Sequence, residues 1–64
     1  MTYILEPWLE RITSSVFLFF PNGEYVFYKN GSELVQLAFD KKYHVREIRA
    51  MENIVEVYLI DIEN

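Results

Sequence analysis

Two Asn-Gly dipeptides, each set between runs of Phe, Tyr, Val and Leu, constrain the fold most. Asn22-Gly23 and Asn30-Gly31 contain the two glycines of this 64-residue chain. Asn-Gly readily adopts the positive φ angles of a type I′ turn, whose twist matches that of two paired strands. The two dipeptides therefore predict consecutive β-hairpins and an antiparallel meander.

The rest of the chain adds a short helix and further strands to this meander. Pro7 suits a first helical turn, and Trp8, Leu9 and Ile12 lie at helical spacing, so residues 6–13 are expected to form a helix. Strands are expected at residues 16–20, 24–29, 32–39, 43–51 and 54–62. The predicted fold is α+β within one small domain, residues 1–64: a short N-terminal helix packed on a twisted five-stranded antiparallel meander sheet.

A helix competes with the strand at residues 32–39. Asn30 and Glu33 have the spacing of a capping box, and the apolar residues that follow also fit a helical arc. The alternative fold is therefore β-β-α-β-β with a helix at residues 32–42. The strand is preferred because Asn-Gly after an aromatic run is the sharper local signal.

Two-residue turns would also fix which residues face each other across the strands. The expected cross-strand pairs are Phe20–Tyr25, Leu18–Phe27, Phe27–Leu34, Tyr25–Gln36, Leu34–Ile48, Glu33–Arg49, Ile48–Val57, Arg49–Glu56 and His44–Asp61. Oppositely charged side chains meet in three of these pairs, which supports the register. Arg49 is expected to lie between Glu33 and Glu56.

Both faces of this predicted sheet are largely apolar, whereas an antiparallel sheet with one solvated face should alternate cleanly. The short helix is expected to cover the face that carries Phe17, Phe19 and Tyr58. The other face is expected to be covered by curling of the sheet into a half-barrel, by a second copy of the chain or by another protein. The residues predicted to form this protein interface are Leu18, Phe20, Tyr25, Phe27, Leu34 and Ile48. A homodimer is the simplest arrangement. Trp8 is expected to anchor the helix in the core.

Composition excludes several classes of protein. Ten acidic residues against six basic ones give a net charge of −4, which disfavours binding to a nucleic-acid backbone. The hydrophobic fraction of 52% and aromatic fraction of 17% exclude a disordered tail. The longest apolar run is too short to span a bilayer. The absence of cysteine and of a signal-peptide pattern favours a cytoplasmic protein, and residue usage is compatible with a bacterial or phage origin.

Candidate catalytic and metal-binding groups are few. His44, the single histidine, is expected to face Asp61, but no nucleophile lies near this pair. His44, Asp61, Asp40 and Glu63 could converge on a metal, although no ligand-spacing motif supports such a site. Glu33, Glu47 and Glu56 fit an ion-pair cluster around Arg49 better than paired catalytic acids. No catalytic residue, cofactor or metal is therefore expected.

The sequence thus predicts a small, non-catalytic protein-interaction domain that acts through an apolar and aromatic sheet face. An inhibitor, an immunity or antitoxin-type protein and an accessory regulatory protein all fit this description. The alternatives are a self-associating structural subunit of a larger assembly and an acidic mimic of nucleic acid. The mimic would depend on Glu47, Glu52, Glu56 and Glu63 gathering on one face. No nucleic acid or membrane is expected as a partner.

Overall fold

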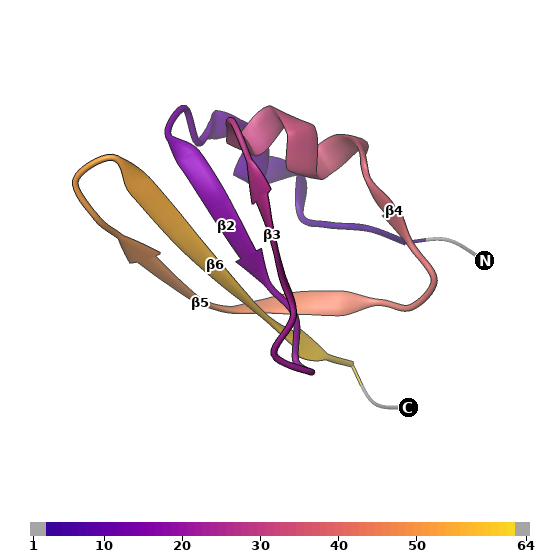
Figure 1. Ribbon diagram of the computed structural model, residues 1–64. Helices are drawn as coiled ribbons and strands as arrows, with labels where there is room; N and C mark the ends of the chain where they lie inside the picture. Colours follow the sequence, from indigo (N-terminus) through magenta and orange to yellow (C-terminus); the bar gives the residue numbers. More distant parts are fainter. Residues whose placement is uncertain (1–2, 63–64) are drawn as a thin grey trace.

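The computed structural model describes residues 3–62, which form strands and two 3-10 helices (Figure 1). The strands are β1 (Tyr3–Ile4), β2 (Ser15–Phe19), β3 (Tyr25–Tyr28), β4 (Ala38–Phe39), β5 (Tyr43–Ala50) and β6 (Ile54–Asp61). The 3-10 helices are η1 (Pro7–Arg11) and η2 (Gly31–Gln36). The described residues contain no α-helix, so the predicted helix at 6–13 is wrong in type. The observed helix η1 has only five residues, which are too few for a stable α-helix.

The main sheet has four strands in the order β3-β2-β6-β5, and its two central strands run parallel. The predicted five-stranded antiparallel meander is therefore wrong, although four of its five expected strands do form, as β2, β3, β5 and β6. The parallel pairing brings Val16 and Leu18 of β2 beside Val55 and Val57 of β6. β2 and β6 lie at the centre of the sheet because they carry the apolar residues that the core buries.

The β2–β3 loop has three residues rather than two, which shifts the predicted register by one. A two-residue turn would make Pro21 and Glu24 the closing pair, but Pro21 has no N–H to donate. Instead Phe20 N–H donates to Glu24 O at 2.8 Å, and Gly23 alone takes a positive φ, of 94°. The observed pairs are Phe19–Tyr25 and Phe17–Phe27, so the predicted pairs Phe20–Tyr25 and Leu18–Phe27 are wrong.

Asn30-Gly31 begins η2 and is not a hairpin turn. The Asn30 Oδ1 atom accepts a hydrogen bond from Ser32 N–H at 3.1 Å, which caps the helix, and Gly31 is buried. The predicted strand at 32–39 is therefore wrong, and so is the alternative α-helix at 32–42, because η2 ends at Gln36 and β4 follows. The predicted pairs of this strand, Phe27–Leu34, Tyr25–Gln36, Leu34–Ile48 and Glu33–Arg49, do not form, since Leu34, Gln36 and Glu33 belong to η2.

The β5–β6 hairpin agrees with the predicted register over half its length. The pairs Ile48–Val57 and Arg49–Glu56 are confirmed. A β-bulge between Val45 and Glu47 then shifts the register by one, so His44 faces Ile60 and the predicted His44–Asp61 pair is wrong.

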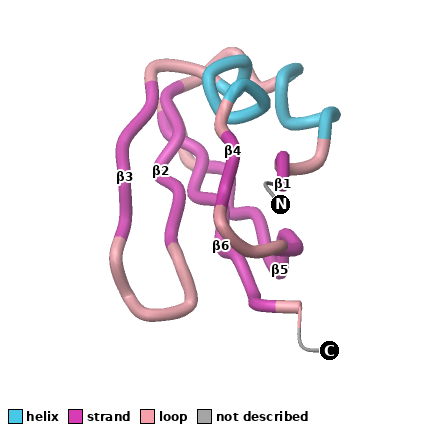
Figure 2. The backbone as a smooth tube through the Cα atoms, turned by 90° about the vertical axis from the view of Figure 1, so that its right-hand side faces the viewer, coloured by secondary structure: helices cyan, strands magenta, loops and turns pink. Residues whose placement is uncertain are grey.

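A single hydrophobic core lies on one side of the four-stranded sheet, which we call the inner face. The fully buried or nearly buried core residues are Leu5, Leu9, Val16, Leu18, Leu34, Val57 and Leu59. The helices η1 and η2 pack against each other and cover one end of this face, with the β1–β4 pair beside them (Figure 2). Leu9 and Leu34 supply the buried side chains of the two helices, whereas Trp8 is 45% exposed and does not anchor the core as predicted.

Candidate functional site

The opposite side of the sheet, which we call the outer face, carries five neighbouring aromatic side chains. These residues, which we call the aromatic patch, are Phe17, Phe19, Tyr25, Phe27 and Tyr58. They share this face because the strand register places Phe17 beside Phe27, and Phe19 between Tyr25 and Tyr58. Tyr25 and Phe27 are 61% and 50% exposed, and the other three are half-buried.

The rings of the patch contact one another in a continuous row across three strands. Phe17 meets Phe27 edge to face with 5.2 Å between ring centroids, and Phe19 lies 5.5 Å from Tyr25. Phe19 and Tyr58 are stacked, with centroids 4.8 Å apart and ring planes inclined by 11°. Such contacts fix the orientation of the rings, so the patch presents a pre-arranged apolar surface.

Charged residues of β5 and β6 border the patch on the Tyr58 side. The Arg46 and Arg49 guanidinium carbons each lie 5.8 Å from the centre of the Tyr58 ring, within range of a cation–π interaction. Arg49 Nε donates to Glu47 Oε2 at 2.7 Å, and this ion pair lowers the pKa of Glu47. The Tyr58 hydroxyl donates to Glu56 Oε1 at 2.9 Å, and that hydrogen bond raises the pKa of Tyr58.

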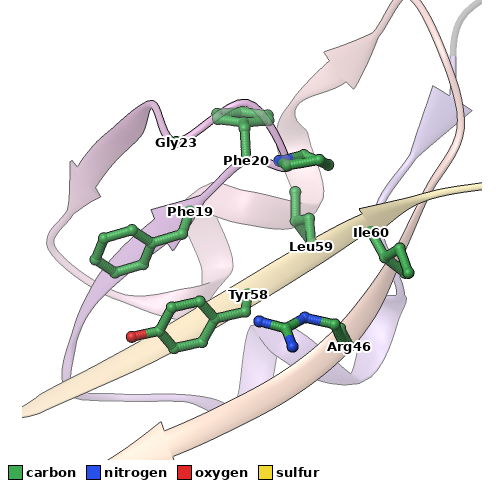
Figure 3. A pocket seen from close by; sticks show the side chains of 8 residues that line it. Phe19, Phe20, Gly23, Arg46, Tyr58, Leu59 and Ile60 are labelled. Carbon is green, nitrogen blue, oxygen red and sulfur yellow. The ribbon is translucent and has the colours of Figure 1, made fainter.

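A shallow hollow of about 350 Å³ adjoins the patch where β2, β6 and the β2–β3 loop meet. Its walls are Phe19, Phe20, Pro21, Gly23, Arg46, Tyr58, Leu59 and Ile60. Figure 3 shows the Phe19 and Tyr58 rings lying side by side on one wall, with the Arg46 guanidinium pointing toward Tyr58. The hollow is apolar except for Arg46, so it suits an apolar side chain bordered by an acidic group.

The six predicted interface residues do not share one surface. Leu18 and Leu34 are fully buried in the core, and Phe20 packs on the inner side against Phe39 and Tyr43. Ile48 faces inward with Val57 but is 37% exposed. Only Tyr25 and Phe27 lie on the outer face, because the one-residue register shift moves β3 side chains across the sheet.

Sequence reasoning placed Phe17, Phe19 and Tyr58 on the face that a helix would cover, and so missed them as surface residues. The signal that could have found them is Pro21. Pro21, directly before Asn22-Gly23, fits the second position of a type I turn. A type I turn followed by a glycine with a positive φ forms a three-residue hairpin loop.

The groups considered for catalysis or metal binding do not come together in one cluster, although Glu47 and Glu56 both lie near Arg49. His44 is exposed opposite Ile60, and Asp61 instead receives Lys41 Nζ at 3.2 Å. Glu33 accepts the Lys29 N–H at 2.8 Å, whereas Arg49 forms its ion pair with Glu47. Among residues 3–62, no group of three or more His, Asp or Glu side chains is placed to hold a metal ion. Glu63, one member of the predicted metal group, lies outside the described residues.

No protein-family model, no curated protein and no solved structure matches the chain. No helix in the described part of the chain is long and apolar enough to cross a membrane.

Proposed function

We propose that the chain is a small, non-catalytic protein-binding domain whose outer face binds another protein. The observation that carries this proposal is the aromatic patch, which stays accessible although the core on the inner face is already closed. Seven core residues are at most 4% exposed, and none of them belongs to the patch. The five rings are therefore not needed to complete the core.

The composition of the outer face resembles that of protein interfaces. Such surfaces are enriched in Tyr, Phe and Arg, with a polar rim around an apolar centre. Here the rim consists of Arg46, Arg49, Glu47 and Glu56, beside Tyr58. Contiguous exposed apolar areas of several hundred Å² on small proteins commonly mark interaction sites.

The same rim argues against the acidic-mimic alternative. A mimic of nucleic acid needs uncompensated negative charge on one face, whereas Glu47 and Glu56 lie among two arginines. A regulatory role in the cytoplasm, as an inhibitor, immunity-type protein or accessory subunit, fits a compact acidic chain without cysteine.

Affinity measurements on two variants, each with one aromatic side chain replaced by alanine, test this proposal. Tyr58→Ala removes a ring from the centre of the outer face, whereas Trp8→Ala removes an exposed ring from η1. A target retained from host lysate by the wild-type chain is purified, and its affinity for the three proteins is measured by calorimetry. We expect Tyr58→Ala to weaken binding by about 2 kcal/mol, a factor of about 30 in Kd, and Trp8→Ala to leave it within about twofold.

Two results would contradict the proposal. One is equal loss of binding in Tyr58→Ala and Trp8→Ala. The other is that every target of the wild-type chain binds Tyr58→Ala with an unchanged Kd. Far-UV circular dichroism of both variants establishes that each retains its fold before binding is compared.

A further inference from the structure

The four-stranded sheet has two edges, β3 and β5, and the described residues 3–62 protect only β5 along its length. An exposed edge invites pairing with another strand, and proteins prevent this with charges, bulges or covering side chains. β5 has a bulge between Val45 and Glu47 and carries His44, Arg46, Glu47 and Arg49. In addition, Glu6 reaches from the start of η1, and its Oε2 accepts the Val45 N–H at 3.3 Å.

Within its own four residues β3 has none of these protections, and a side chain covers the edge only after its end, where Glu33 accepts the Lys29 N–H. Its four residues, Tyr25–Tyr28, include no charge and no proline, and no bulge interrupts their pairing with β2. Val26 on the inner side is 42% exposed, and Tyr25 and Phe27 on the outer side are more exposed still. Both sides of this edge strand are therefore apolar and accessible, which a strand that stays at the edge of a monomer usually avoids.

The backbone of β3 shows which groups an added strand would meet. Residues in an antiparallel pair alternate between facing their partner with N–H and C=O and facing away. Glu24 O accepts from Phe20 in β2, whereas Lys29 N–H points away from β2 and donates to Glu33 Oε2 at 2.8 Å. By this alternation, the N–H and C=O groups of Tyr25 and Phe27 point into the edge, where no described strand lies.

We propose that β3 pairs antiparallel with β3 of a second copy, with Val26 facing Val26 on the twofold axis. In this register Tyr25 of each copy faces Phe27 of the other. Both are positions whose polar groups point outward, so the two pairs form four backbone hydrogen bonds. Centring the pair on Phe27 would instead place Tyr25 opposite Lys29, whose N–H Glu33 already occupies.

This pairing joins two four-stranded sheets into one and makes a single aromatic surface across both copies. Because the twofold axis is perpendicular to the sheet, the outer faces of both copies stay on the same side. Each Tyr25 then lies beside the Phe27 of the other copy, extending the two aromatic patches toward each other. A short edge buries little area, so the dimer is expected to form in the micromolar range or weaker.

Charge exchange at Val26 tests both the dimer and its register. In Val26→Lys, two ammonium groups face each other across the axis, and in Val26→Glu two carboxylates do, so each variant alone should dissociate at least about tenfold more readily. An equimolar mixture of the two variants places Lys opposite Glu and should restore association. Sedimentation equilibrium measures the mass, compared with 7.7 kDa for one chain.

Ile48→Lys and Ile48→Glu are the matched controls, because Ile48 is a similarly exposed apolar residue on the protected edge strand β5. Both should associate like the wild type. The proposal is overturned if the wild type stays monomeric at millimolar concentration, if either Val26 variant associates normally, or if the mixture stays monomeric while both variants are folded.

A measurement on the wild-type chain covers the case in which a Val26 variant fails to fold. Hydrogen exchange of the Tyr25 and Phe27 amides, followed by NMR, should slow as protein concentration rises, because these amides become bonded only in the dimer. The Lys29 amide, already bonded to Glu33, should exchange at a constant rate. Concentration-independent exchange at Tyr25 and Phe27 across the range would contradict the pairing.

Discussion

Gly31, the first residue of η2, lies directly against the end of η1. Its N–H donates to Ile12 O at 2.7 Å, and a Cβ on Gly31 would lie 2.8 Å from the Ile12 Cβ and would also clash with the Leu9 carbonyl. Its backbone φ is not in the left-handed region, so the requirement for glycine here is one of space. The second Asn-Gly dipeptide thus reflects helix packing, whereas the first reflects turn geometry.

Gly31→Ala should therefore destabilise the fold by about 1–3 kcal/mol, because the added methyl forces η1 and η2 apart. Gly23→Ala is the control. Its Cβ would meet open space, so only the cost of a positive φ remains, about 1 kcal/mol. Urea unfolding followed by circular dichroism measures both. If Gly31→Ala lost no more stability than Gly23→Ala, the result would show that the two helices tolerate separation.

Tyr58 offers a test of the hydrogen bond at the rim of the aromatic patch. Because its hydroxyl donates to Glu56 Oε1, its pKa is raised above the ordinary tyrosine value of 10.0. A raised folded-state pKa contributes stability that is fully present below the pKa of the unfolded chain. That stability is lost as pH rises through the folded-state pKa.

Glu56→Ala should accordingly lower the pKa of Tyr58, as followed by the ¹³Cζ shift of labelled tyrosine in an NMR titration. It should also reduce the loss of stability between neutral pH and strongly alkaline pH. Glu52→Ala, which removes an exposed acid from the β5–β6 turn, should leave the Tyr58 titration unchanged. An unaltered Tyr58 pKa in Glu56→Ala would mean that the hydrogen bond does not persist in solution.

Among the elements, local signals located four strands and their two hairpin pairings, but not the parallel pairing of β2 with β6. The β-branched and aromatic runs correctly predicted β2, β3, β5 and β6, and a two-residue turn between the last two strands correctly aligned Ile48 with Val57. The predicted register was wrong at two places where the chain contains one residue more than expected, in the loop at Pro21 and in the β-bulge at Arg46. Since side chains alternate with a period of two, each one-residue error changed the face of the residues beyond it, and the aromatic patch was missed for this reason.

Asn30 shows how a capping signal competed with a hairpin signal. The Asn30 side chain accepts the Ser32 N–H, and Glu33 accepts the Lys29 N–H, so two exposed amides at the β3–η2 junction are satisfied. Asn30→Ala should cost about 1 kcal/mol of stability, and Asn30→Asp should retain most of it. Chemical unfolding of the pair measures the difference, and a loss in Asn30→Ala no greater than in Ser32→Ala would remove the cap from the explanation.

The parallel β2–β6 pair joins segments that lie far apart in the sequence, so it could not be predicted from neighbouring residues. A parallel pair needs a crossover connection, and here that connection contains β3, η2, β4 and β5. Half-buried Phe20, Phe39 and Tyr43 meet edge to face and hold this connection against the sheet. Such contacts between distant segments decide the topology, and no short-range pattern reports them.

Leu34 tests whether η2 is needed to close the core. It is fully buried and joins Leu9 of η1 in the same core as the β2 and β6 residues. Leu34→Ala removes this side chain and leaves a cavity, which should cost about 2–5 kcal/mol. A domain of this length has a total stability of roughly 3–10 kcal/mol, so a substantial fraction of the variant should be unfolded at 37 °C.

Thermal unfolding monitored by circular dichroism and by Trp8 fluorescence compares Leu34→Ala with Gln36→Ala, an exposed change in the same helix that should be nearly neutral. Both probes should report one transition in each protein, because η1, η2 and the sheet share one core. Two results would show that η2 is not part of the cooperative core. One is a decrease of less than about 1 kcal/mol in the free energy of unfolding of Leu34→Ala, and the other is a separate early transition reported by Trp8. The sheet would then have to hold its inner face closed without η2.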